Sequence, residues 1–428
     1  MSELGVVIIG LNGAVASTVI AGVKLMARGL APRIGMITER TDANIADAIT
    51  SLMEFAPLEK LAFAGWDLRF ANVYEGALNH KVLANDVLRQ VKSELEEIKP
   101  WPAVFSKAYA ANAAGENIVM AKGQREEIEI LTKNIEDWKK ARGIDRVVMV
   151  NLASTESYLP VGDAHKSLEA FEKALDANDP VITPAMRYFY VANRLGIPYC
   201  NFAPSLTNIP ALQDHATKNK NPYAGMDGKT GQTLLKTALA PMLRVRRLHL
   251  EGWYSTNFLG NNDGLVLDNP GSNKTKVLSK ASVLDSIVGY HVENHQVHIH
   301  YYKPRGDSKE AWDNIDILGF AGVPMQIKVN FLCQDSALAA PLVLDLVRLL
   351  DVSKRVGEYG IQRQLSIFFK SPYAAEGEQP VHDLFKQEEL LLKWAREKAA
   401  ALKAKGGATA NGHKHEAGPA SPKTLDSR

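Results

Sequence analysis

Cysteine is scarce in this chain, and long apolar runs are missing. Only two cysteines, Cys200 and Cys333, occur among 428 residues, so we expect neither a disulfide framework nor a cysteine-based metal site. The first apolar run, Val6 to Ile9, is too short for a signal peptide, and no run reaches the roughly 18 residues that a membrane helix needs. These absences predict a cytoplasmic protein without a membrane partner.

Neither sign of charge is in excess, because 50 Lys and Arg face 48 Asp and Glu. Such a balance predicts no nucleic-acid partner, and any anion site must be local. The apolar fraction of 46% is large enough for a full core. The length allows about two or three domains.

The chain opens with the pattern of a buried strand, a glycine turn and a helix. The strand covers Val6 to Ile9, the turn Gly10 to Ala16, and the helix begins near Ala16 and ends near Met26. Small residues in such a turn let backbone amides and a helix N-terminus approach a pyrophosphate. Asn12 replaces the second glycine of the usual fingerprint, so the pattern fits either a dinucleotide site or a plain tight turn.

Strand and helix patterns then alternate, which is typical of a parallel sheet covered on both faces. The expected strands are 146–150 and 197–202, and the expected helices are 165–175 and 185–195. The strands lead into two polar segments, Asn151 to Glu156 and Asn201 to Asn208. Ligands bind at the carboxyl ends of parallel strands, so these segments could line a nucleotide cleft, although loop and cap chemistry also explains each of them.

After about residue 225 the patterns change to those of a second, antiparallel or mixed sheet. Strands are expected at 248–254, 296–302 and 326–332, and a further strand at 365–369. Asp335 to Leu350 predicts a buried helix with Asp335 as its N-cap. From about Ala399 the composition becomes rich in Ala, Lys and Gly and predicts a disordered tail.

Three polar features could carry chemistry. Lys229 to Thr233 lead directly into a helix pattern and would make a phosphate cradle, or simply a capped helix start. Gly260 to Lys280 combines amides, aspartates and lysines, which suit a sugar phosphate and its developing oxyanions but also suit a solvated hairpin loop. His298 and His300 share one strand face, and we interpret them as ordinary strand residues without a metal.

Five motifs in sequence order resemble those of the myo-inositol-1-phosphate synthase family. They are DGKTGQT at 227–233, GNNDG at 260–264, SNKTKVLSK at 272–280, GDSK at 306–309 and QDSALAAPLVLDLV at 334–347. The resemblance extends to about Pro372. It implies a Rossmann-type doubly wound parallel sheet with an inserted α+β catalytic and oligomerisation domain. The corresponding division is 1–225 and 339–398 for the NAD-binding domain, 226–338 for the inserted domain and 399–428 for the tail.

The resemblance implies a cyclisation of D-glucose 6-phosphate to 1D-myo-inositol 3-phosphate without net redox change. Bound NAD oxidises the sugar at C5, enolisation and aldol closure follow, and the same cofactor reduces the product. An ammonium group can stabilise the oxyanions that develop in these steps. A homotetramer is also implied.

The residues follow by motif. Those implied to be catalytic are Lys276, Lys309, Lys370, Asp227, Asp307 and Asp335. Those implied to bind the phosphate or sugar hydroxyls are Thr230, Gly231, Gln232, Thr233, Lys280, Asn257, Asn261 and Asn262. Those implied to bind NAD are Gly10, Asn12, Gly13, Ala14, Val15, Asp67, Asn151, Ser154, Thr155 and Asp263.

The glycine turn departs from the family's usual G-x-G-G-N-N-G, since this chain has G-L-N-G-A-V-A from Gly10 to Ala16. This departure leaves the choice between NAD and NADP open. Two other functions also remain as alternatives. One is an NAD-linked dehydrogenase or cyclase for a different sugar phosphate, and the other is a catalytically silent NAD-binding regulator.

Overall fold

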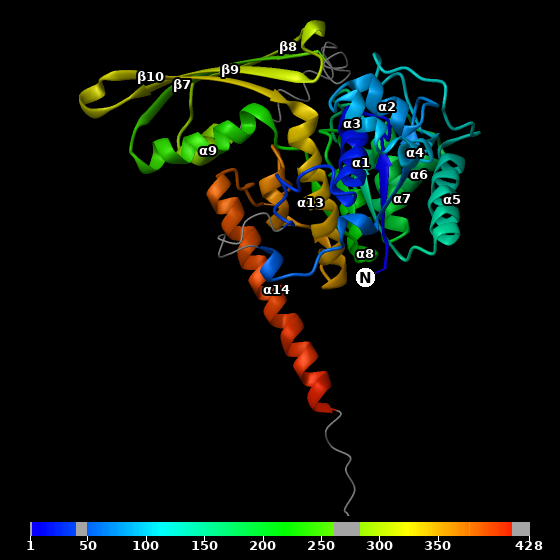
Figure 1. Ribbon diagram of the computed structural model, residues 1–428. Coiled ribbons are helices and arrows are strands. Elements are labelled where there is room, and N and C mark those ends of the chain that lie inside the picture. Colours follow the sequence, from blue (N-terminus) through cyan, green and yellow to red (C-terminus); the bar gives the residue numbers. More distant parts are fainter. Residues whose placement is uncertain (1, 40–48, 261–282, 376, 413–428) are drawn as a thin grey trace, which may run out of the picture.

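The computed structural model describes residues 2–39, 49–260, 283–375 and 377–412, which form two sheets (Figure 1). The larger sheet has seven parallel strands in the order β11-β6-β5-β4-β1-β2-β3. These strands are β1 Leu4–Ile9, β2 Leu61–Asp67, β3 Trp101–Pro102, β4 Arg146–Asn151, β5 Tyr199–Asn201, β6 Pro222–Gly225 and β11 Gly360–Ile361. The chain reverses its winding between β1 and β4, where such sheets bind ligands.

Helices cover both faces of this sheet, so side chains of either parity along a strand are buried. In β1, Val6 and Ile8 enter one core cluster, and Val7 and Ile9 enter the other. The first face is covered by α1 Ala14–Ala27, α2 Val73–His80, α3 Asn85–Arg89, α4 Lys92–Glu96 and α13 Asp335–Arg355. The second face is covered by α5 Gln124–Arg142, α6 Leu168–Asp176, α7 Pro184–Arg194 and α8 Pro210–Lys218. The predicted doubly wound fold is therefore confirmed.

The smaller sheet has four strands in the order β10-β9-β7-β8. Its strands are β7 His249–Leu259, β8 Asn294–Tyr301, β9 Ser308–Leu318 and β10 Pro324–Gln334. Only β7 and β8 run parallel, whereas β9 pairs antiparallel with both β7 and β10. One face packs against α9 Gly231–Val245 and α12 Val283–Val288, around Trp253 and Ile315.

The chain returns to the larger sheet through α13 and β11 and ends in α14 Leu384–Gly412, which extends away from the body (Figure 1). Short 3₁₀ turns complete the described elements: η1 Ile49–Ser51, η2 Leu58–Lys60, η3 Asp163–His165, η4 Lys303–Arg305, η5 Phe320–Gly322 and η6 Arg363–Phe368. None of the helices in the described ranges is long and apolar enough to cross a membrane.

One predicted element is wrong. The expected strand at 365–369 is the 3₁₀ turn η6, in which Leu365 and Phe368 are both buried. A 3₁₀ helix repeats every three residues, so these two apolar residues fall on one side of it. Helix α14 continues past Ala399 to Gly412, so it covers the first part of the expected tail, and residues 413–428 lie outside the described residues. Alanine and lysine, which are abundant there, favour helix.

Candidate functional site

A cavity of about 430 Å³ lies at the carboxyl ends of the parallel strands. It is lined by Gly10 after β1, Asp67 at the end of β2 and Asn151 at the end of β4. The other predicted cofactor residues that line it are Gly13, Ala14, Val15, Ser154 and Thr155. Sequence reasoning therefore identified most of one wall.

The glycine turn presents backbone to this cavity. Gly10 has a φ of +86°, and a Cβ atom there would lie 3.1 Å from the backbone of Ala153. Helix α1 begins at Ala14, earlier than predicted. Its N-cap is Gly13, which has no side chain that could cover the amides at the helix start. Amides at a helix N-terminus suit a pyrophosphate. The residues of the turn thus fit a dinucleotide.

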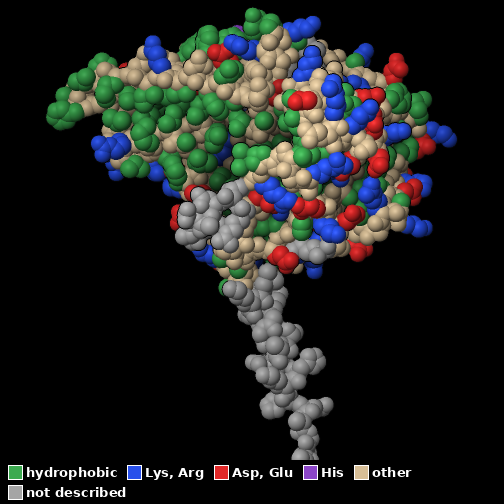
Figure 2. Space-filling view, viewed as in Figure 1, with side chains coloured by type: hydrophobic (Ala, Val, Ile, Leu, Met, Phe, Trp, Pro, Cys, Tyr) green, Lys and Arg blue, Asp and Glu red, His purple; other side chains and the backbone are tan. Residues whose placement is uncertain are grey.

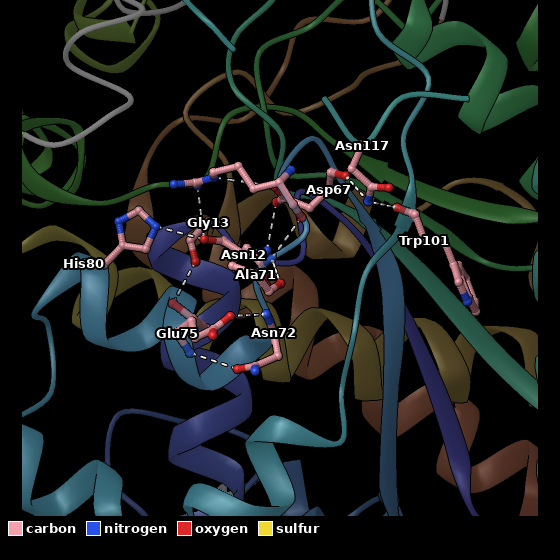
Figure 3. A network of polar contacts seen from close by, with 11 residues as sticks. Asn12, Gly13, Asp67, Ala71, Asn72, Glu75, His80, Trp101 and Asn117 are labelled. Atoms are coloured by element: carbon pink, nitrogen blue, oxygen red, sulfur yellow. Dashed lines mark hydrogen bonds and ion pairs between the residues drawn. The ribbon is translucent and has the colours of Figure 1, made fainter. Parts of the chain in front are cut away.

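Asn12 lies in the turn but does not line the cavity, and its side chain is directed toward Ala71 (Figure 3). Its backbone N–H donates to Asp67 Oδ2 at 2.9 Å, and its side-chain amide donates to the carbonyl of Ala71. Its carbonyl accepts a 2.8 Å hydrogen bond from His80 Nε2. Asn12 therefore fastens the turn to the segment before α2.

Sequence reasoning missed Arg69 and His80, which both line the cavity beside Asp67. Arg69 donates its N–H to Asp67 Oδ1 at 3.0 Å, and its guanidinium lies 3.7 Å from that carboxylate. Burial lowers the pKa of His80, and its hydrogen bond to Asn12 opposes that shift. One sequence signal could have pointed to Arg69, which is its position two residues after the end of β2. His80 has no comparable signal.

On the opposite side, the cavity is lined by Asp227 and Lys370, which form a buried ion pair. Lys370 Nζ lies 2.7 Å from Asp227 Oδ1, and both side chains are at most 4% exposed. The backbone supports the pair, because the N–H of Lys370 donates to the carbonyl of Asp227 at 2.7 Å. Gly228, next to Asp227, packs against Phe202, since a Cβ atom there would clash with the Phe202 ring.

A second polar cluster joins the two sheets and consists of Thr230, Lys309 and Asp335. Thr230 Oγ1 donates to Asp335 Oδ1 at 2.9 Å, and Lys309 Nζ lies 3.3 Å from the same oxygen. Asp335 is the first residue of α13 rather than its N-cap, which is Gln334. The N-cap prediction is therefore wrong, because the carboxylate instead bonds residues from α9 and β9.

Asp307, which directly precedes β9, caps the start of α13. Its carboxylate accepts 2.9 Å and 2.7 Å hydrogen bonds from the N–H and the hydroxyl of Ser336. Asp307 thereby fixes the helix that carries Asp335. The predicted catalytic role of Asp307 stays a prediction, since these hydrogen bonds show only its contact with Ser336.

The start of α9 carries the predicted phosphate residues Gly231, Gln232 and Thr233, all of them buried. Asn257 donates to the side-chain oxygen of Gln232, and Gln232 donates to the carbonyl of Thr256 at 3.2 Å. These amides hold the start of the helix against β7.

Lys229 does not join the predicted phosphate cradle. Its ammonium points away from the cavity and donates to Gln387 of α14. The remaining predicted residues, Lys276, Lys280, Asn261, Asn262 and Asp263, lie outside the described residues.

The family model described as myo-inositol-1-phosphate synthase, an NAD-binding family, matches residues 4–396. The chain belongs to the myo-inositol-1-phosphate synthase family. The inositol-3-phosphate synthase 1 of Bacteroides thetaiotaomicron is 46% identical over 407 residues, which are 92% of this chain and 95% of that protein. Isozyme 1 of Arabidopsis thaliana is 30% identical over 431 residues, covering 91% of this chain and 84% of that one.

Solved structures agree with this assignment at the level of the fold. The inositol-3-phosphate synthase of Caenorhabditis elegans has a TM-score of 0.86 at 24% identity and covers 93% of this chain and 86% of that chain. A myo-inositol-1-phosphate synthase-related protein from Thermotoga maritima has a TM-score of 0.73 at 24% identity, covering 92% and 98%. The chain therefore shares its overall fold with both structures.

Proposed function

We propose that the protein converts D-glucose 6-phosphate into 1D-myo-inositol 3-phosphate. One observation carries the assignment of the site: a single cavity is lined by the glycine turn, by the Asp227–Lys370 ion pair and by Asp335. A nicotinamide cofactor and a sugar held in this cavity would meet an ammonium group. NAD, when bound, takes an electron pair from C5 of the sugar and returns it at the end of the reaction.

The cofactor residues divide into backbone and side-chain contacts. The amides of Gly13, Ala14 and Val15 at the start of α1 would bind the pyrophosphate. Asp67, at the end of β2, would accept hydrogen bonds from a ribose. Asn151 donates to Asn201 at 3.0 Å and so joins the ends of β4 and β5, which supports the loop that carries Ser154 and Thr155.

The lysines supply positive charge where the reaction creates negative charge. Lys370 and Lys309, each held by an aspartate, would stabilise the oxyanions of the enolate and of the aldol step. Because Asp227 and Asp335 fix the two ammonium groups in advance, little reorganisation is needed when charge develops. Lys276 is proposed to act with them on the basis of its motif alone.

The phosphate is proposed to bind at the start of α9. The hydroxyl of Thr230 donates to Asp335 and does not cap the helix, so the amides of Gly231, Gln232 and Thr233 suit an anion. Lys280 would complete this site by its motif. Asn257, with Asn261 and Asn262, would bind sugar hydroxyls.

The test is the identity of the product that the purified protein forms from glucose 6-phosphate with catalytic NAD, followed by ³¹P and ¹H NMR. We expect an inositol monophosphate without net change in NAD. Accumulation of NADH in step with substrate loss would instead support the dehydrogenase alternative. Absence of any turnover, with NAD still bound, would support the silent regulator.

A homo-oligomer, with a tetramer as the form implied by the family resemblance, is part of the proposal. Figure 2 shows hydrophobic side chains gathered over α9 and the four-stranded sheet. Val245 on α9 and Phe320 beyond β9 are 71% and 96% exposed, and Leu332 on β10 is 60% exposed. A second copy would cover such a surface. Sedimentation equilibrium tests the state, and a monomer would contradict it.

A cytoplasmic location is also proposed. Both cysteines of the chain, Cys200 and Cys333, are free thiols, as expected in a reducing compartment. Fractionation of the source cells with an antibody against the protein would test it.

A further inference from the structure

The loop from Asp227 to Thr230 has two sides with different partners. Asp227 and Thr230 line the cavity and bond Lys370 and Asp335. Lys229, between them, points to the opposite side and is only 3% exposed. Its backbone N–H donates to the carbonyl of Phe368 at 2.8 Å, so the loop is pinned next to the segment that leads to Lys370.

The Lys229 ammonium meets the C-terminal helix. It donates to Gln387 Oε1, and Gln387 is fully buried in the first turn of α14. The side-chain amide of Gln387 in turn donates to the carbonyl of Val381, which fixes the acceptor oxygen. Within the described ranges no carboxylate forms an ion pair with Lys229.

The start of α14 is itself anchored to α9. Asp383 accepts hydrogen bonds from the N–H groups of Phe385 and Lys386 at 3.1 Å and 3.3 Å and so caps α14. Its other oxygen lies 3.0 Å from the guanidinium of Arg244, which belongs to α9. Helix α9 begins directly after Thr230, so Arg244 links the start of α14 to the same helix that follows the Asp227–Thr230 loop.

We propose that Lys229 is a positioning residue, which fastens the Asp227–Thr230 loop to Gln387 so that α14 sets the placement of Asp227 and Thr230 in the cavity. The inference rests on the proposed function for its kinetic consequences. It assigns a role to the C-terminal helix, which lies apart from the cavity lining.

The charge state of this contact follows from its surroundings. Burial lowers the pKa of Lys229 to about 7. The charged or titratable groups around it are His382, whose pKa burial lowers to about 4, and the Asp383–Arg244 pair. A carboxylate in place of the Gln387 amide would favour the ammonium form and raise the pKa of Lys229.

The test compares Gln387→Leu, Gln387→Glu and Lys229→Met in the full-length protein, with Lys393→Met on the exposed side of α14 as control. We expect kcat to fall about tenfold or more in Gln387→Leu and Lys229→Met, because small displacements of catalytic groups cost that much or more. Gln387→Glu keeps an acceptor for the Lys229 ammonium but loses the donor to Val381, so its kcat should fall less than that of Gln387→Leu. Lys393→Met should match the wild type.

Hydrogen exchange of the 226–231 amides gives a second measurement that needs no turnover. We expect faster exchange in Gln387→Leu and Lys229→Met than in Gln387→Glu and the control. Wild-type kcat and unchanged exchange in Gln387→Leu would overturn the positioning role. Failure of the wild type to form product, with the exchange difference intact, would overturn the proposed function and leave the positioning role supported.

Discussion

Lys370 and Asp227 form an ion pair of 2.7 Å in which both side chains are almost fully buried. Removal of two charges from water is costly, and such a pair is seldom kept for stability alone. Its place in the wall of the cavity gives it a functional reason, since the aspartate holds an ammonium where oxyanions develop.

Replacement of Lys370 by Met should reduce turnover by about 10²-fold or more, the scale for loss of one oxyanion stabiliser. It should also destabilise the fold by roughly 3 to 5 kcal/mol, because the buried Asp227 carboxylate loses the ammonium that faces it at 2.7 Å. Product formation and urea unfolding measure the two effects. The double variant Lys370→Met with Asp227→Leu serves as control and should recover stability but not activity. Recovery of both would remove the pair from catalysis.

Replacement of Asp335 by Asn should lower turnover by about tenfold or more, since a hydrogen bond to a charged group is worth roughly 1.5 to 3 kcal/mol. The amide keeps an acceptor for Thr230 but no longer attracts the Lys309 ammonium. Steady-state kinetics with glucose 6-phosphate provides the measurement. Asp86→Asn, on the exposed side of α3, is the matched control. Equal rates in the two variants would contradict the role of the cluster.

Replacement of Asp67 by Ala should weaken NAD binding by about tenfold or more. The variant loses an acceptor for a ribose and also the hydrogen bond that fixes the N–H of Asn12 in the glycine turn. Calorimetric titration of the protein with NAD in the absence of substrate measures this directly. The same Asp86→Asn variant should bind NAD like the wild type. An unchanged Kd for Asp67→Ala would place the ribose elsewhere.

Lys236 should make stability depend on pH. Its amine, buried under the four-stranded sheet 2.7 Å from His295 Nε2, has its pKa lowered by burial to about 7. Between pH 7 and about 10 the unfolded chain therefore holds a proton that the folded protein has released. The free energy of unfolding should rise with pH across this window, with this lysine contributing up to about 1.4 kcal/mol per pH unit.

Urea unfolding at several pH values checks this expectation. Lys236→Met should flatten the pH dependence relative to the wild type, whereas Lys133→Met, at a 72% exposed side chain, should leave it unchanged. Identical slopes for Lys236→Met and the wild type would show that the amine keeps an ordinary pKa in the folded protein.

Periodicity and motif order predicted the parts of this protein that depend on local sequence. The alternating runs identified strands such as β1 and β4, and the motifs identified Lys309, Lys370, Asp227 and Asp335, which the fold brings to one region. These residues lie close together because strand ends and helix starts of a parallel sheet converge at one edge, while their catalytic roles stay predictions.

The failures at the candidate site share one physical cause, which is that the direction of a side chain in a loop depends on contacts distant in sequence. Lys229 faces α14, where its ammonium donates to Gln387, a residue 158 positions later in the chain. Asp335 bonds across to Thr230, and its capping role passes to Asp307. The residues next to Lys229 and Asp335 in the sequence do not indicate which distant residues these side chains bond.

The pairing of Asp227 with Lys370 spans 143 positions, with the whole four-stranded sheet between them. During synthesis the first partner therefore emerges long before the second, and a fragment that contains Asp227 but stops short of Lys370 lacks the lysine that pairs with this aspartate. Expression of residues 1–338 alone should for this reason give an inactive and poorly stable product, while addition of the C-terminal piece in trans should restore the pair.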